Sequence, residues 1–315
     1  LVRLYTFTGN IKKANEIVNE LKKSKIEDSI PLNKKAAYYQ ELSFPFHDMD
    51  NNKMFAAYNK QAKDIYKTID SKYDYCIAGV NEADGYWGGG YLDNAKEVMF
   101  RSLQKAEEWD IEHAIDISYI CYSNILSSLD VNQSNLDKYE KGINLANKIG
   151  HDWDEIYGKI YYSLAKAETL CENTYNDLKN LSKLALEKDY KYLSELALSY
   201  SLIVNLFIKK SKTIKIQNVN MLTFNSSRLY HLSYELLLHN KITNINLIFD
   251  LLDSTDGVKG RPYLIYYILE LHKDEFTDIQ KEKFINFANK CYLGISNLSN
   301  IYKERILDYV GIRKK

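Results

Sequence analysis

Apolar residues recur at three and four places along most of the chain and rarely alternate with polar ones, which predicts helices rather than strands. Only three prolines interrupt the 315 residues. The 27 tyrosines favour strands intrinsically, yet they fall in the same helical register, as Tyr119 and Tyr122 do. Because packing in register overrides such preferences, the pattern predicts a nearly all-α protein.

A longer spacing is superimposed on the helical one. A turn residue is followed five places later by a small or apolar residue. A second small or apolar residue comes seven places after the first. The clearest copies are Gly9/Ala14/Leu21, Asp50/Phe55/Ala62, Gly90/Ala95/Ser102, Asn173/Leu178/Ala185 and Asn240/Ile245/Leu252. The first three begin about forty residues apart, which is typical of helical hairpins that stack on their neighbours.

The segments before the turns also share their offsets, with a small residue between large ones where two helices cross closely. These residues are Tyr39, Leu42, Ser43 and Phe46 before Asp50, and Leu229, Leu232, Ser233 and Leu236 before Asn240. Together the spacings resemble the tetratricopeptide repeat (TPR) family over roughly residues 1 to 255. Tyr or Leu replaces the usual Trp, the closing proline is missing, and the period is near forty. The resemblance implies a right-handed α-solenoid of antiparallel helix pairs, with about six to seven hairpins.

The pattern divides the chain into three parts. Residues 1–187 carry TPR-like repeats, and residues 188–224 form a degenerate hairpin or connector that is either a hinge or an ordinary loop. Residues 225–315 hold one more repeat and then capping helices, expected at 263–271, 276–293 and 298–310. Because residues 1–8 already predict the end of a helix, we expect this chain to be a segment of a longer protein.

Charge and cysteine usage narrow the possible partners. Lys+Arg and Asp+Glu both total 42, so no overall basic field attracts nucleic acid or an anionic membrane, and we expect neither partner. Cys76, Cys121, Cys171 and Cys291 lie far apart without a CxxC pair. They are typical of buried thiols in a reducing compartment, which predicts a cytoplasmic location.

Two motifs that imitate ligand loops are better explained as turns. The Gly-rich stretch 85–91 lacks the Lys-Ser/Thr and the preceding strand of a phosphate loop, so we expect a repeat turn with close interhelical approach. The stretch 48–53 begins like a calcium loop but has Lys53 at the sixth place and Asn59 at the twelfth. It predicts a polar turn between helices.

Candidate chemistry is sparse in this sequence. The six histidines form no HxxxH or HExxH pair, so no metal site is expected. Neither His113 with Cys121 nor His151 with Asp152 and Asp154 has the spacing of a recognisable catalytic group. We therefore expect no enzymatic activity and no cofactor.

The resemblance places a ligand in the concave groove, on the first helix of each hairpin. Carried onto this chain, the partner-binding positions are Gln40, Phe44, His47, Val80, Asp84, Trp87, Ile117, Ile120 and Asn124. Amide, carboxylate, imidazole and aromatic groups together suit a peptide. For Trp87 the alternative is packing beneath its Gly turn, and Trp109 and Trp153 are expected to pack at junctions between repeats.

The expected function is therefore recognition of a peptide or protein. Repeats with this longer period resemble the sensor repeats of bacterial STAND-type transcriptional regulators, which implies the sensor part of a larger regulator. One alternative is a constitutive protein–protein interaction scaffold. Another is the sensor domain of a peptide-pheromone receptor behind a helix-turn-helix. A homodimer is compatible with each of these.

Overall fold

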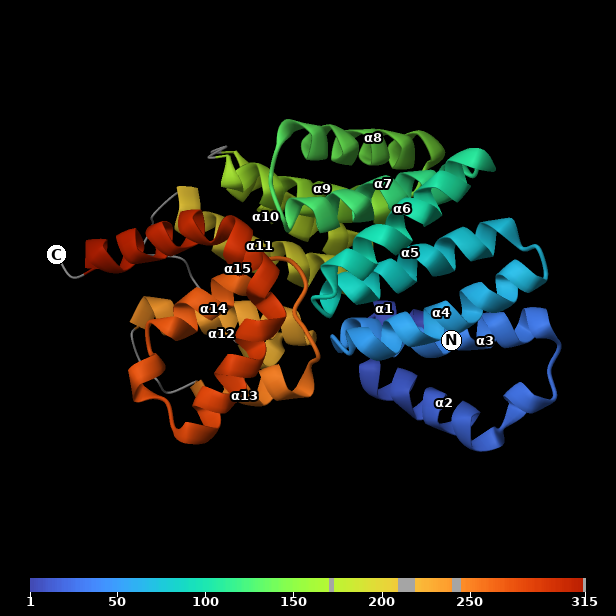
Figure 1. Cartoon of the computed structure of the whole chain (residues 1–315), viewed down its shortest axis with the longest axis horizontal. Coiled ribbons are helices and arrows are strands. Elements are labelled where there is room, and N and C mark those ends of the chain that lie inside the picture. The colour runs from blue at the N-terminus through green and yellow to red at the C-terminus, as the bar shows by residue number, and fades with distance from the viewer. Residues whose placement is uncertain (170–172, 209–218, 240–244, 314–315) are drawn as a thin grey trace.

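The computed structural model describes residues 1–169, 173–208, 219–239 and 245–313. Within these ranges the regular structure is entirely helical, with no strand (Figure 1). The prediction of an all-α protein is confirmed. The helices are α1 Val2–Phe7, α2 Ile11–Ser24, α3 Leu32–Asp48, α4 Asn52–Thr68, α5 Lys72–Gly88, α6 Leu92–Glu108, α7 Glu112–Ser127, α8 Gln133–Ile149, α9 Asp152–Glu168, α10 Thr174–Glu187, α11 Lys191–Ile208, α12 Asn225–His239, α13 Ile245–Ser254, α14 Pro262–Glu270 and α15 Asp278–Arg313.

The repeat has a simple physical origin in its turns. Asp50, Asp70, Gly90, Asp110 and Gly150 all have positive φ, and they follow one another at intervals of twenty or forty residues. In each turn the next backbone N–H reaches back to a carbonyl of the preceding helix, as Asn51 N does to Phe46 O at 2.9 Å. This is the Schellman arrangement, which Gly adopts freely and Asp tolerates. One helix therefore occupies about twenty residues, and a hairpin about forty.

The five-and-seven spacing marks the packing face of the second helix in each hairpin. Phe55, Ala62, Ala95 and Ser102 are all buried, and so are their counterparts in α10 and α13, whereas Leu21 is half-buried. Helices consecutive in the sequence pack against one another along the array. The spacing therefore identifies stacking contacts, as predicted.

The carboxyl-terminal region differs from the prediction in two respects. α15 is one helix of 36 residues, where two helices were predicted. The predicted break contains no proline, and a single Gly294 costs a helix only about 1 kcal/mol, which is too little to end it. Of the proposed connector 188–224, residues 191–208 form α11, and residues 209–218 lie outside the described part of the chain, as does the turn residue Asn240.

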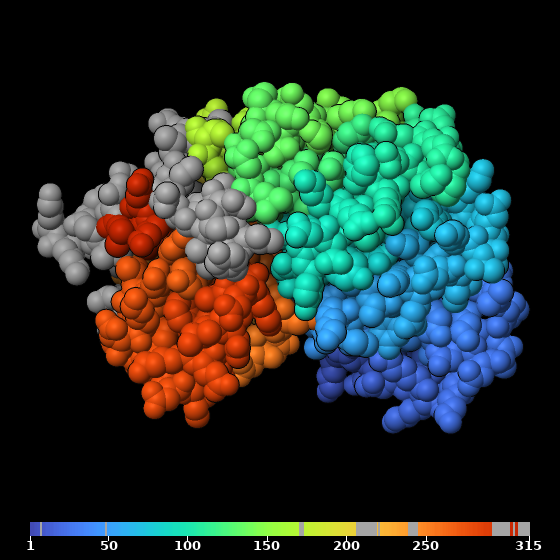
Figure 2. Space-filling view, viewed as in Figure 1, coloured from blue at the N-terminus to red at the C-terminus, as the bar shows by residue number. Residues whose placement is uncertain are grey.

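The carboxyl-terminal region also reaches back to the second repeat instead of only capping the last one. Asp256 accepts hydrogen bonds from the backbone N–H groups of Asn52 (2.7 Å) and Lys53 (2.6 Å) at the start of α4. Asp50 accepts one from Ser226 N at 2.8 Å. In the space-filling view the orange residues lie directly against the light-blue and teal ones (Figure 2). The array therefore closes on itself, and residues 255–262 lie against its concave side.

Close backbone approach explains the Gly-rich stretch, as predicted. A Cβ atom on Gly85 would lie 2.8 Å from Ala56 N and 2.9 Å from Asn52 O, both in α4. A Cβ on Gly88 would lie 2.1 Å from Asn52 Oδ1. The glycines let α5 approach α4, and Gly90 makes the turn at φ +82.

Three cysteines, Cys76, Cys121 and Cys291, are buried free thiols, as predicted, and Cys171 lies outside the described residues. None of the helices, as far as they are described, has the length and apolar character needed to cross a membrane.

Gly90 and Gly150 allow a matched test of the closure. Alanine at either position is strained, since φ is +82 at Gly90 and +77 at Gly150, and each change should cost about 1–2 kcal/mol. Only at Gly90 would the Cβ also meet a backbone atom, Lys290 O of α15 at 2.7 Å, whereas Gly150 has open space. We expect Gly90→Ala to lower the free energy of unfolding by about 1–3 kcal/mol more than Gly150→Ala. Equal losses in urea unfolding would contradict the contact with α15.

Candidate functional site

The concave side of the first helices holds a cavity of about 440 Å³. Because side chains separated by three or four places share one face of a helix, α3, α5, α7 and α9 each turn a row of residues toward it. Six of the nine predicted partner-binding residues line this cavity: Gln40, Phe44, His47, Val80, Asp84 and Ile117. Its other lining residues are Arg3, Phe55, Ile77, Asn81, His113, Cys121, Gly150, His151, Asp152, Trp153, Asp154, Tyr157 and Tyr190. We call this cavity the groove.

Asp84 is the charged centre of one side of the groove. Its carboxylate forms an ion pair with Lys259 of the 255–262 segment, lies 3.4 Å from His47 Nε2, and accepts a hydrogen bond from the Tyr157 hydroxyl at 3.5 Å. Burial alone would raise the pKa of Asp84, but Lys259 and His47 together hold that pKa well below its ordinary value. The carboxylate is therefore ionised, and the chain itself supplies its main counter-charge.

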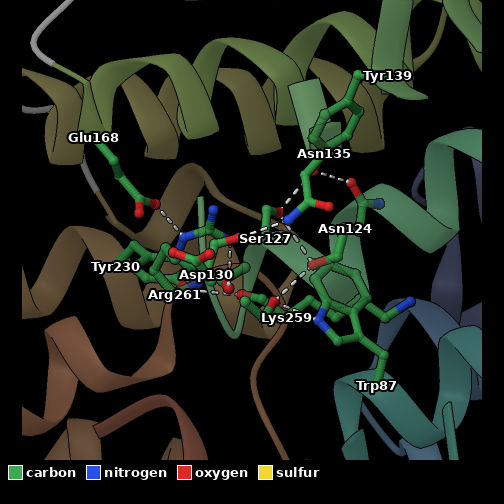
Figure 3. Close-up of polar contacts among 12 residues, drawn as sticks. Trp87, Asn124, Ser127, Asp130, Asn135, Tyr139, Glu168, Tyr230, Lys259 and Arg261 are labelled. Carbon is green, nitrogen blue, oxygen red and sulfur yellow. Dashed lines mark hydrogen bonds and ion pairs between the residues drawn. The ribbon is translucent and has the colours of Figure 1, made fainter. Parts of the chain in front are cut away.

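The remaining three predicted residues do not line the groove. Trp87 donates from Nε1 to Ser128 Oγ at 2.8 Å, and Ile120 is fully buried. Asn124 is also buried: its Oδ1 accepts from the Tyr139 hydroxyl at 2.7 Å (Figure 3). For Trp87 the structure shows the packing alternative, beneath the glycines that end α5. Asn124 therefore faces α8 and α9, where it contacts Tyr139 and Tyr157, and Trp87 lies beside Gly257 and Val258 of the 255–262 segment.

A second polar group lies in the wall of the groove, where α7 and α9 begin. His113 and Asp116 lie one turn apart on α7, and His151 and Asp154 lie three places apart at the start of α9. His113 Nε2 is 3.0 Å from Asp154 Oδ2, and His151 Nδ1 is 3.8 Å from Asp116 Oδ2. Sequence reasoning missed this group because its two halves are separated by 38 positions and neither half alone matches a metal motif.

Asp116 is the most deeply buried carboxyl of this group. Its side chain is fully buried, and its Oδ2 atom has no hydrogen-bond partner. Burial, together with the nearby Asp154 carboxylate, raises the pKa of Asp116 to about 8. Two carboxylates and two imidazoles in this arrangement offer four ligand atoms to a cation.

Two further residues complete the description of the groove. Burial and the Asp84 carboxylate raise the pKa of the Cys121 thiol well above its ordinary value, so Cys121 is not a thiolate nucleophile at neutral pH. Trp153 stacks on Tyr157 with ring centroids 4.9 Å apart and also lines the groove.

Outside the groove, Trp109 packs edge-on against Tyr75, with ring centroids 5.8 Å apart, as expected of a residue at a junction between repeats.

Comparison with known proteins adds nothing to this geometry. No protein-family model matches the sequence, and no curated protein matches it at a significant level. The function must therefore be argued from the residues of the groove.

Proposed function

We propose that this chain is a non-catalytic recognition region that binds a peptide or protein segment in its groove. In this proposal the helices form a right-handed, TPR-like solenoid of about six to seven hairpins, and the region acts as the cytoplasmic sensor part of a larger bacterial regulator. The observation that carries the proposal is the convergence of Gln40, Phe44, His47, Val80, Asp84 and Ile117 on one cavity of about 440 Å³. A cavity of that size suits a small ligand or a few residues of a peptide.

The chemistry of the lining supports a peptide. The aromatic faces of Phe44 and Trp153 offer apolar contact area, and the Gln40 and Asn81 amides offer both donors and acceptors for a peptide backbone. Asp152, which is paired with Lys188, and Asp154, which contacts His113 and His151, place carboxylates at one side. We therefore expect bound peptides to combine an apolar anchor with a basic residue.

The chain itself provides an internal example of such binding. The 255–262 segment runs along the concave side and inserts the fully buried Lys259 side chain against Asp84, with its ammonium 5.6 Å from the centre of the Phe55 ring. A non-helical segment with a basic side chain is therefore a ligand type that this surface accommodates. The groove lies next to this occupied part of the surface.

A display experiment tests the proposal. Random short peptides displayed on phage would be selected on the wild-type protein and then measured on two tryptophan variants. Asn81→Trp fills the groove from a half-buried position on α5, and Gln104→Trp places the same side chain on the exposed side of α6. We expect selected peptides to bind Asn81→Trp at least about tenfold more weakly, and Gln104→Trp unchanged. Failure to select any peptide, or equal affinity for both variants, would contradict the proposal.

Hydrogen exchange then distinguishes a sensor from a constitutive scaffold. A sensor must bind its ligand with different affinity in two states, so a selected peptide should change amide exchange in residues 255–262, beyond the contact site. A scaffold predicts protection confined to the groove.

A further inference from the structure

The four side chains in the groove wall converge on a single point. Each offers one ligand atom, and the four atoms lie within 4.8 Å of one another. His113 and Asp116 share one face of α7 because they are separated by three places. His151 is the N-cap residue of α9, and its Nδ1 lies 3.6 Å from Oδ2 of Asp154 in the first turn of that helix. Two rigid helices therefore position the group.

Three separations among these atoms are close to those of tetrahedral coordination. Zinc binds imidazole nitrogen and carboxylate oxygen at about 2.0–2.1 Å, which places neighbouring ligand atoms about 3.3 Å apart. The separations are 3.0 Å for His113 Nε2 and Asp154 Oδ2, and 3.6 Å for His151 Nδ1 and Asp154 Oδ2. His151 Nδ1 and Asp116 Oδ2 are 3.8 Å apart. Small rotations of these side chains would bring all four atoms to one ion.

Two of the four ligand atoms have no other role. Asp116 Oδ2 and His151 Nδ1 are buried atoms without a hydrogen-bond partner. Within the described residues, neither Asp116 nor Asp154 has a Lys or Arg at ion-pair distance. A bound cation would give both buried atoms a partner.

The surroundings of the group also suit a metal. The Tyr73 hydroxyl on α5 lies 2.6 Å from His113 Nδ1. When Nδ1–H donates to Tyr73, the lone pair of His113 is on Nε2, the atom that points into the group, and such outer partners are usual for ligating histidines. The His113 and His151 side chains are 30% and 36% exposed, so an ion can enter through the groove.

We propose that His113, Asp116, His151 and Asp154 bind a divalent transition-metal ion, with zinc as the best match. Two imidazole ligands favour zinc and its neighbours over magnesium or calcium, which prefer oxygen ligands throughout. The proposal does not depend on peptide binding, because it is tested with the metal alone.

The test uses the untagged chain after treatment with a chelator. Calorimetric titration with zinc chloride should show one site per chain, and one equivalent of cobalt(II) should give the intense visible absorption of a tetrahedral complex. Zinc should raise the thermal unfolding temperature, because it binds the folded state preferentially. No zinc binding, or a weak octahedral cobalt spectrum, would show that the four residues are only a hydrogen-bonded cluster.

Variants assign the binding to these residues. His151→Gln and Asp154→Asn should each weaken zinc binding by more than a hundredfold, since each removes a ligand. Glu155→Gln removes the same charge one place along α9, from a residue paired with Lys159, and should leave zinc affinity unchanged. Tyr73→Phe should weaken zinc binding by about ten- to a hundredfold through His113. Zinc affinity equal to wild type in both ligand variants would overturn the proposal, and circular dichroism would confirm that each variant is folded.

Discussion

Replacing Lys259 with Met should lower the free energy of unfolding by about 3–5 kcal/mol, the usual cost of removing one partner of a buried ion pair. The Lys259 side chain is fully buried, and its ammonium contacts the Asp84 carboxylate, of which 8% is exposed. Without Lys259 this carboxylate would keep, among the described residues, His47 and Tyr157 as partners. Most of the loss should therefore come from the uncompensated charge of Asp84, not from the missing lysine contacts.

A double-mutant cycle in denaturant unfolding tests this explanation. Asp84→Asn alone should also destabilise, because it leaves the Lys259 ammonium buried. The double variant Lys259→Met/Asp84→Asn should lose clearly less than the sum of the two single losses. The exposed Lys12 provides a control, and Lys12→Met should change stability by less than about 0.5 kcal/mol. Additive losses would show that Lys259 and Asp84 do not interact.

The same pair predicts a pH dependence with a defined sign. The pKa of Asp84 is held below its unfolded value near 4, so the folded state binds fewer protons than the unfolded state in acid. The stabilisation is complete above about pH 4 and is lost as the pH falls toward the folded pKa. The difference in unfolding free energy between wild type and Lys259→Met should therefore shrink below pH 4. A constant difference across this range would contradict the ionised pair.

The helices, their ends and their common faces were predictable from the sequence because each depends on residues close together in the chain. Apolar periodicity predicted helices, and the recurring turn residues predicted where they end, since Gly90 and Asp50 adopt positive φ. The helical repeat also placed Gln40, His47 and Asp84 on a common face, and that face lines the groove. Helix geometry alone was enough for each of these predictions.

The features that the sequence did not predict depend on contacts between residues distant in the sequence. Lys259 lies 175 positions from Asp84, and no motif marks a lysine that will be buried. Trp87 lies beside Gly257 and Val258, which are 170 and 171 positions later in the sequence, and Asn124 is buried against Tyr139 and Tyr157. A repeat pattern describes how neighbouring hairpins stack, and it does not specify what later covers the stack.

The four-residue group in the groove wall is an intermediate case. Each pair, His113 with Asp116 and His151 with Asp154, is visible in the sequence as residues three places apart on a predicted helix. Neither pair matches a metal motif by itself, because the two histidines lie 38 positions apart on different hairpins. Only the packing of α7 against α9 brings the pairs together.

Replacing Gly257 with Ala should be the most damaging single-methyl change in the 255–262 segment. A Cβ at this position would lie 2.0 Å from Gly88 O and 2.9 Å from Gly89 Cα. Both are backbone atoms, so no side-chain rotation relieves the contact, and the segment must move away from the end of α5. We expect the free energy of unfolding to fall by about 3 kcal/mol, the upper part of the usual range for overpacking.

The displacement should also reach the residues that anchor the segment. Lys259 pairs with Asp84. Arg261 contacts Glu168 at 2.5 Å, and the Tyr230 hydroxyl donates to Lys259 O and accepts from Arg261 N (Figure 3). If Gly257→Ala shifts the segment, Lys259 loses its position, and the Lys259→Met change should cost less in the Gly257→Ala background than in the wild type. Gly89→Ala is the matched control, because its Cβ would meet chiefly the movable Tyr91 ring at 3.2 Å. A loss for Gly257→Ala no larger than that for Gly89→Ala would show that the segment does not pack tightly against the glycines of α5.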